Sequence, residues 1–357
     1  MKRRKTKKVW VKDVPIGGGS PITVQSMTNT DTKDVCATVG QIKRLERVGC
    51  EIIRVAVTDE QDAKALAEIK KRIKIPLVAD IQFDYMLALA SIKSGVDKLR
   101  INPGNIGARW RVEEVAKACK DKNIPIRIGV NSGSLPMDLR KTYDGVKPEG
   151  MVEAALRELA ILEDMDYHNI VISLKTSDVL TTIESYRLIS KKVNYPLHLG
   201  ITEVGPVRVG SIRSAVGIGI LLDSGIGDTI RVSLTGDPID EVKAGYEILK
   251  SLSLREYGPT LISCPTCARC EINLITLVTK VERRLSKIKK PIKVAVMGCV
   301  VNGPGEAREA DVGIAGGKGY GILFKMGRVI GRVKEKEIVK RLMEEIEDIL
   351  KGDNIKT

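Results

Sequence analysis

The 357-residue sequence predicts an α/β protein, with a TIM-type (β/α)8 barrel followed by a small α/β domain that carries cysteines. From residue 21 onward, short apolar segments alternate with helical patterns, which indicates parallel βαβ units. Eight such units in about 230 residues match a closed barrel in number and length. No Gly-x-Gly-x-x-Gly motif opens the first helix, as would be usual in an open dinucleotide-binding sheet. We expect the barrel over residues 1–257 and the second domain over 258–357.

The eight expected strands are short and mostly apolar. Four of them open with a proline, which suits the first position of a strand. They span Ile22–Met27, Glu51–Val57, Pro76–Phe83, Lys98–Asn102, Pro125–Asn131, Asn169–Lys175, Pro196–Thr202 and Thr229–Leu234. Between them, apolar residues recur every three or four positions, as in amphipathic helices. Such helices include Val35–Val48, Glu60–Ile73, Val112–Lys122, Met151–Met165 and Ile239–Leu252.

The pattern changes around Tyr257-Gly-Pro-Thr260, where we expect the second domain to begin. A cysteine turn comes first, and regular elements follow it. They are a charged helix at Glu271–Lys289, a strand at Lys293–Met297, a strand near Val312–Ala315, a Gly-rich hairpin at Gly316–Val329 and a closing helix at Glu335–Lys351.

Composition excludes several classes of protein. Hydrophobic residues make up 43% of the chain, which is too many for a disordered protein. The longest apolar runs, such as residues 218–222, are far too short to span a membrane. The basic segment Met1–Lys8 has no apolar stretch behind it, so we expect a solvated arm and a cytoplasmic protein.

The net charge of +14 raises the question of nucleic-acid binding. Phe and Trp number only two each, which leaves few rings for base stacking. Lys and Arg are also spread along the expected helices, as on an ordinary solvated surface. The composition therefore favours a small anionic substrate and disfavours nucleic acid.

Basic residues interrupt five of the otherwise apolar strands. They are Arg54, Arg100, Arg127, Lys175 and Arg231. Residues two apart on a strand point to the same face, so further polar side chains should join them. These are Asp80, Gln82, Asn102, Asn131, Ser177 and Ser233. Such side chains would converge on the C-terminal mouth of the barrel, where barrel enzymes bind their substrates.

Buried cations must meet anions, because burying an unpaired charge costs several kcal/mol. Salt bridges with Asp80 and Glu203 could neutralise two or three of the five cations, but inward acids are too few for all of them. A polyanionic ligand, most simply a diphosphate, would balance the rest. Glu203, at the end of the seventh strand, is a candidate proton donor or an ion-pair partner.

Three cysteines lie in two Gly/Pro-rich turns, Cys264-Pro-Thr-Cys267 and Met297-Gly-Cys299-Val-Val-Asn-Gly-Pro-Gly-Glu306. A closed zinc site would need a fourth ligand such as Cys270. A ferredoxin-type run would need Cys at position 274, where the chain has Leu274. Three thiolates and an exchangeable carboxylate, that of Glu306, could instead hold an iron–sulfur cluster and leave one iron open to substrate. The remaining cysteines, Cys36, Cys50 and Cys119, are interpreted as small core residues.

Long motifs throughout the chain resemble the 4-hydroxy-3-methylbut-2-enyl diphosphate synthase family, in its two-domain bacterial form. The motifs are Gln25-Ser-Met-Thr28, Val78-Ala-Asp-Ile81, Arg100-Ile-Asn-Pro-Gly-Asn-Ile-Gly107, Gly129-Val-Asn-Ser-Gly-Ser134, Gly225-Ile-Gly-Asp-Thr-Ile-Arg-Val-Ser233 and the two cysteine turns. This family acts in the methylerythritol phosphate route to isoprenoids, and the resemblance covers essentially the whole chain.

The resemblance implies a [4Fe–4S] cluster on Cys264, Cys267, Cys299 and Glu306. It implies reductive ring opening and dehydroxylation of 2-C-methyl-D-erythritol 2,4-cyclodiphosphate to 4-hydroxy-3-methylbut-2-enyl diphosphate, with Glu203 and Glu306 as catalytic candidates. Two electrons would come from flavodoxin or ferredoxin. Family members are similar in forming homodimers, in which the cluster domain closes over the barrel of the partner.

The chain departs from the family pattern at two positions. Gln82 stands where the family commonly has His, so a proton-transfer role at this position is in doubt. Cys270 is an additional thiol to which the pattern gives no role. The alternative from another class is a zinc-stabilised RNA-binding protein, and a visible absorption spectrum would distinguish brown iron–sulfur protein from colourless zinc protein.

Overall fold

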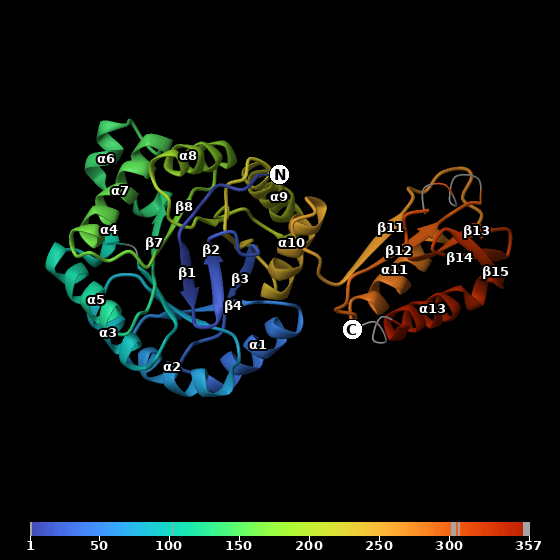
Figure 1. Cartoon of the computed structure of the whole chain (residues 1–357), viewed down its shortest axis with the longest axis horizontal. Helices are drawn as coiled ribbons and strands as arrows, with labels where there is room; N and C mark the ends of the chain where they lie inside the picture. The colour runs from blue at the N-terminus through green and yellow to red at the C-terminus, as the bar shows by residue number, and fades with distance from the viewer. Residues whose placement is uncertain (1, 102, 301–304, 306–307, 353–357) are drawn as a thin grey trace. The chain divides into compact units, whose positions relative to one another are not determined.

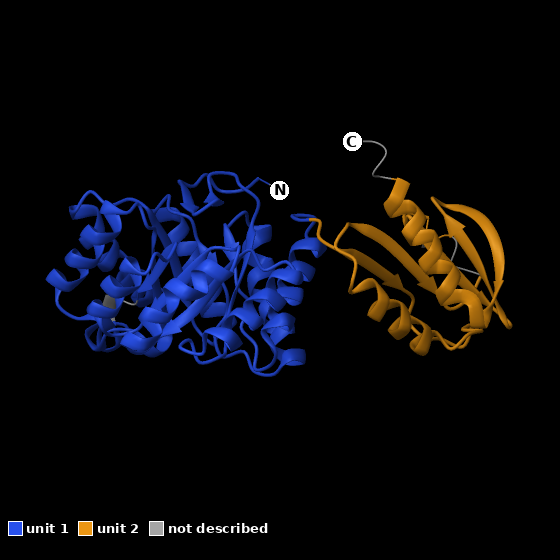
Figure 2. Ribbon diagram, turned by 90° about the horizontal axis from the view of Figure 1, so that it is seen from below, with its two compact units in different colours: residues 1–255 blue, residues 256–357 orange. Residues whose placement is uncertain are grey.

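The computed structural model describes residues 2–101, 103–300, 305 and 308–352. The chain forms two compact units, residues 1–255 and 256–357 (Figure 2). The division lies two residues before the boundary expected from the sequence. The first unit is an eight-stranded parallel barrel and the second is a small α/β domain, so the predicted fold class is confirmed.

The barrel strands follow one another in chain order around the ring. They are β3 (Thr23–Met27), β4 (Ile52–Val57), β5 (Leu77–Ile81), β6 (Lys98–Ile101), β7 (Ile126–Asn131), β8 (Ile170–Lys175), β9 (His198–Leu199) and β10 (Thr229–Ile230). β10 pairs in parallel with both β3 and β9, and a parallel bridge between Ile172 and Leu197 closes the remaining gap. β9 and β10 end earlier than expected. Beyond β10, the Leu234 N–H donates to the Glu241 side chain instead of a neighbouring strand.

Helices surround the strands, as Figure 1 shows. They are α1 (Val35–Arg47), α2 (Glu60–Arg72), α3 (Tyr85–Lys93), α4 (Pro103–Ile106), α5 (Arg109–Asp121), α6 (Met137–Thr142), α7 (Pro148–Asp164), α8 (Val179–Lys192), α9 (Val207–Asp223) and α10 (Pro238–Ser251). Aspartate caps start several of them. The Asp59 and Asp178 side chains, for example, accept backbone N–H groups of the first turns of α2 and α8.

An N-terminal hairpin, which the sequence analysis did not predict, closes the barrel at the N-terminal ends of its strands. β1 (Lys8–Val11) pairs antiparallel with β2 (Val14–Gly17). Val11 and Ile16 are fully buried against Ile52 of β4 and Val78 of β5. The hairpin therefore covers the N-terminal ends of these strands and leaves the C-terminal mouth as the end where a substrate can enter.

The basic N-terminal segment is not the solvated arm that we expected. The Arg4 N–H donates to Gly225 O at 2.9 Å, and the Lys7 N–H donates to Asn194 O at 2.8 Å. The Arg3 guanidinium forms an ion pair with Asp228 at 3.2 Å. Backbone hydrogen bonds and a nearly buried carboxylate thus bind this segment to the loops before β9 and β10.

The second unit contains a five-stranded sheet and two longer helices. The strands, in spatial order, are β11 (Pro259–Ser263), β12 (Ile292–Met297), β13 (Val312–Gly317), β14 (Tyr320–Lys325) and β15 (Arg328–Lys334). β11, β12 and β13 are parallel, whereas β14 and β15 form antiparallel pairs. The helices α11 (Leu274–Leu285) and α13 (Ile338–Gly352) share one apolar core with the sheet. β11 was not predicted, and the strands of the predicted hairpin extend beyond residue 329.

The structure also bears on membrane insertion. In the described ranges, no helix has both the length and the apolar character to cross a membrane.

The three cysteines of the barrel differ in burial. Cys50 and Cys119 are buried as expected, but Cys36 is exposed on α1, so its interpretation as a core residue was wrong. It lies at the second position of the helix, where its sulfur accepts a long hydrogen bond from Arg72 Nη1 of α2 at 4.0 Å.

Glu158 of α7 leads to a prediction about stability. One of its carboxylate oxygens is buried without a hydrogen-bond partner among the described residues, and burial raises the pKa of Glu158 to about 7. The folded state thus binds a proton more tightly than the unfolded state, and the chain loses stability as the pH rises from about 4.5 to 7. Glu158→Gln should therefore stabilise the protein by on the order of 2 kcal/mol at pH 8.

The measurement is chemical denaturation of both proteins at pH 5 and pH 8. The gain should nearly vanish at pH 5, where the parent carboxyl group is already neutral. An equal gain at both pH values would contradict the role of ionisation.

Candidate active site

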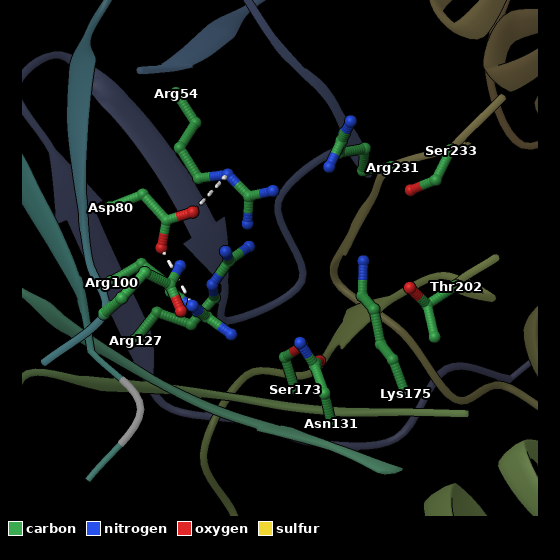
Figure 3. A pocket seen from close by; sticks show the side chains of 11 residues that line it. Arg54, Asp80, Arg100, Arg127, Asn131, Ser173, Lys175, Thr202, Arg231 and Ser233 are labelled. Atoms are coloured by element: carbon green, nitrogen blue, oxygen red, sulfur yellow. Dashed lines mark hydrogen bonds and ion pairs between the residues drawn. The ribbon is translucent and has the colours of Figure 1, made fainter. Parts of the chain in front are cut away.

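A cavity of about 150 Å3 lies at the C-terminal end of the barrel strands (Figure 3). Strand alternation turns one residue in two toward the barrel axis, and these inward residues form the cavity wall. The lining residues are Arg54, Asp80, Gln82, Arg100, Arg127, Asn131, Ser173, Lys175, Thr202, Arg231 and Ser233. Eight of the substrate-binding residues proposed from the sequence are thus brought together. Asn102 lies outside the described residues.

Asp80 provides the carboxylate with which two arginines on one side of the cavity form ion pairs. Its carboxylate pairs with Arg100 Nη1 at 3.0 Å and with Arg54 Nε at 3.5 Å (Figure 3). The strand register explains the arrangement, because Asp80 lies directly opposite Arg100 on the neighbouring strand. Burial alone would raise the pKa of Asp80, but the two guanidinium groups outweigh it and lower the pKa. Asp80 is therefore ionised and holds two arginines in place.

Glu241 of α10 has the same role on the opposite side, and the sequence analysis missed it. Its buried carboxylate pairs with Arg231 Nη2 at 3.2 Å and accepts hydrogen bonds from Ser26 Oγ at 3.1 Å and Leu234 N at 3.0 Å. It thereby positions Arg231 and the segment that leads to Ser233. No pattern along a strand could reveal it, because Glu241 comes from the first turn of a helix.

The remaining two cations of the cavity have no carboxylate of their own. Among the described residues, Arg127 and Lys175 form no ion pair, and Nε and Nη1 of Arg127 have no hydrogen-bond partner. Burial, reinforced by the surrounding guanidinium groups, lowers the pKa of both side chains well below their ordinary values. Five cations therefore face two carboxylates, Asp80 and Glu241, and the cavity is suited to a ligand with several negative charges.

Glycines make room for two of these cations. A Cβ atom at Gly129 would lie 2.7 Å from Arg100 Nε, and one at Gly200 would lie 2.5 Å from Lys175 Nζ. Any larger residue at these positions would displace the charged group. The glycines therefore set where the two cations lie within the barrel.

Gln82 lines the cavity as expected, whereas Ser177 is exposed and does not line it. The polar residues that the sequence analysis did not place in the cavity are Ser173 and Thr202. Both continue the alternation of inward residues on their strands or just beyond them, so the same rule could have found them. Glu203 behaves differently. It is exposed in the loop after β9, with a left-handed backbone (φ 55°), and it is not among the residues that line the cavity. Its catalytic role stays a prediction.

In the second unit, the cysteine turns follow two adjacent parallel strands. Cys264 comes directly after β11, and Cys299 follows β12 by two residues. The Gly298 N–H donates to Cys264 Sγ at 3.2 Å, so the two turns are in contact. Cys270 also lies close to Gly298, where a Cβ atom would be 2.7 Å from the Cys270 sulfur.

The chemistry of these residues fits a soft metal or an iron–sulfur cluster. Hydrogen bonds from the Arg269 backbone and side chain lower the pKa of the exposed Cys267 thiol, which favours the thiolate form that binds metals. Among the described residues, no three His, Cys, Asp or Glu side chains already stand in a metal-binding group. Glu306 lies outside the described residues.

Fold and site together define a barrel enzyme for a polyanionic substrate, joined to a small domain with two cysteine turns. Residues 6–246 match the family described as the GcpE TIM-barrel domain, and residues 260–348 match the GcpE protein C-terminal domain. The chain belongs to the GcpE family. It therefore has 4-hydroxy-3-methylbut-2-en-1-yl diphosphate synthase activity, that of an oxidoreductase of isoprenoid biosynthesis, and the RNA-binding alternative is set aside.

Curated relatives are similar over nearly their whole length. The 4-hydroxy-3-methylbut-2-en-1-yl diphosphate synthase (flavodoxin) of Thermodesulfovibrio yellowstonii is 60% identical, with 97% of this chain and 99% of that protein covered. The enzyme of the same name from Clostridium tetani is 61% identical, with 98% of this chain and 100% of that protein covered. Among solved structures, dihydropteroate synthase from Stenotrophomonas maltophilia has a TM-score of 0.52 at 14% identity, covering 70% of this chain and 98% of that one. This last likeness concerns the barrel fold alone.

The unpaired state of Arg127 predicts opposite effects on stability and activity. Arg127→Met removes a buried charge that lacks a carboxylate, so the melting temperature of the ligand-free protein should rise. The same change removes a charge-assisted contact to the substrate, worth roughly 1.5–3 kcal/mol, so kcat/KM should fall about 10- to 100-fold. Thermal unfolding and steady-state kinetics measure the two effects.

Arg100→Met is the matched control, because it deprives Asp80 of a partner and should lower the melting temperature. If Arg127→Met destabilised the protein as much as Arg100→Met does, the charge imbalance inferred for the cavity would be wrong.

Proposed function

We propose that the barrel binds 2-C-methyl-D-erythritol 2,4-cyclodiphosphate and that the second unit holds a [4Fe–4S] cluster, through which two electrons reach the substrate. Ring opening breaks a C–O bond, and the bonding electrons leave with the phosphate oxygen. The two added electrons form the carbon–carbon double bond as the hydroxyl group departs, and one proton converts that hydroxyl group to water. The product is 4-hydroxy-3-methylbut-2-enyl diphosphate. The observation that supports this best is the cavity in which five cations share two carboxylates.

The cavity residues have distinct tasks in this proposal. Arg127 and Lys175, which have no internal counter-charge, bind the phosphates most directly. Arg54, Arg100 and Arg231 are already oriented by Asp80 and Glu241, so they need little reorganisation when the substrate arrives. Asn131 and Ser233 provide hydrogen bonds at the rim. Together these groups stabilise the additional negative charge on the diphosphate after the ring opens.

Cys264, Cys267 and Cys299 would hold the cluster, with Glu306 as the fourth ligand expected from the family. When bound, such a cluster supplies single electrons and an iron with an exchangeable ligand. Glu203 is the proposed proton donor to the departing hydroxyl group, since its loop follows β9 at the cavity end of the barrel. Gln82 can donate a hydrogen bond from the cavity wall but cannot deliver a proton.

A homodimer is part of this proposal, with the cluster domain of one subunit covering the barrel mouth of the other. Large apolar side chains around the C-terminal ends of β5, β6 and β7 support it. Phe83, Met86, Trp110 and Met137 are between 49% and 69% exposed. Covering such residues would exclude water from the reaction, and exposed apolar groups of this size often mark an interface. The names of the curated relatives support flavodoxin as the electron donor.

The direct test is anaerobic purification followed by turnover of the cyclic diphosphate with reduced flavodoxin. We expect a brown protein with about four iron and four sulfide per chain, and formation of the linear diphosphate. A colourless protein that contains zinc and lacks turnover would refute the proposal.

Cysteine variants test which thiols bind the cluster. Replacement of Cys264, Cys267 or Cys299 by Ser should remove most of the iron and sulfide, since each variant loses a thiolate. Cys270→Ser is the matched control and should keep the parent's iron content and visible spectrum, because the Cys270 thiol is turned to Ile272 O at 3.2 Å. Full cluster content in Cys299→Ser, combined with loss in Cys270→Ser, would reverse the ligand assignment.

A further inference from the structure

The outer strand of the second unit, β15, is exposed along nearly its whole length. It pairs only with β14, so its other edge has no neighbouring strand in the five-stranded sheet (Figure 1). Six of its seven residues are exposed. Bare sheet edges of this kind are sites where other proteins bind unless the edge is protected.

All charged side chains in and around β14 and β15 between residues 312 and 334 are positive. Residues 312–334 contain five cations, at Lys318, Lys325, Arg328, Arg332 and Lys334, and no Asp or Glu. Lys325 pairs with Glu345 of α13 at 3.2 Å. In the part of the chain that the structure describes, the other four cations form no ion pair, and all four are exposed.

Exposed apolar side chains accompany the cations. Met326, Val329 and Ile330, in and beside β15, are 63%, 67% and 45% exposed. Cations on an edge strand can serve simply to prevent association with other sheets. Prevention of association does not explain why aliphatic side chains are exposed next to these cations. A docking surface, in contrast, commonly combines apolar contacts with a charged rim.

The strand register connects this surface to the cysteine turns. Lys334 at the end of β15 lies opposite Tyr320, and Tyr320 lies opposite Gly317 at the end of β13. The Arg332 guanidinium stacks on the Tyr320 ring, 3.3 Å from its centre. β15 is three strand spacings from β12, which leads to Cys299, so the two strand ends are separated by roughly 15 Å.

We propose that this β15 edge, formed by Lys318, Met326, Arg328, Val329, Ile330, Arg332 and Lys334, docks an electron-donor flavodoxin through an acidic face of that protein. The inference rests on the proposed function, since it assumes that electrons enter the cysteine-bearing unit from a protein donor. Positive charge on this edge would steer an acidic partner into place, at rates that depend on ionic strength. A narrow surface of this kind suits the small, short-lived interfaces of redox partners.

The test compares two charge-reversal variants of the full-length, cluster-loaded protein. Lys318→Glu/Lys334→Glu changes the β15 edge without altering a side-chain contact that the structure shows. Lys287→Glu/Lys289→Glu makes the same charge change near the start of β12, at the opposite end of the sheet, and is the control. Turnover is measured with a purified bacterial flavodoxin and with reduced methyl viologen as a small donor, at low and high salt.

For Lys318→Glu/Lys334→Glu, we expect the KM for flavodoxin to rise at least 10-fold at low salt. Turnover with methyl viologen should not change, and the control should match the parent with both donors. An unchanged KM for flavodoxin would overturn the proposal, as would an equal loss with both donors. Binding of an RNA oligonucleotide that the variant loses, with unchanged flavodoxin kinetics, would overturn it in favour of a nucleic-acid surface. If the parent fails with both donors, the proposed function itself is refuted.

Discussion

The excess of buried positive charge in the barrel is the constraint on which the rest of the site depends. Two carboxylates, Asp80 and Glu241, orient three arginines, while Arg127 and Lys175 have no carboxylate partner among the described residues. Such an arrangement costs folding free energy, because unpaired charges are removed from water. The cost is tolerable in a large barrel with an extensive apolar core outside the strands, and it leaves the cavity ready for a polyanion.

The sequence was most informative where a rule of geometry applies along one strand. Alternation placed Arg54, Asp80, Arg127 and Lys175 on one face, and the structure brings them into one cavity. Glu241 could not be predicted in this way, since it reaches the cavity from a helix after the last strand. The hairpin at β1 and β2 was missed because its strands are only four residues long and directly follow the basic segment Met1–Lys8.

The second unit shows a different limit of sequence reasoning. Spacing identified the cysteine turns, and the parallel pairing of β11 with β12 explains how turns more than thirty residues apart come into contact. β11 itself was not predicted, because five residues beginning at a proline give little periodic signal. The exposure of β15 also depends on the order of strands in the sheet, which alternation along a single strand does not report.

The attachment of the N-terminal segment to the loops before β9 and β10 has a consequence for folding. Residues 3–7 bind to Asn194, Gly225 and Asp228, which are synthesised almost 200 residues later or more. The barrel therefore cannot complete its ring by adding βα units one at a time during synthesis. Contacts of such long sequence separation slow folding, and until residue 228 has emerged the early strands remain an open sheet with an edge exposed to other chains.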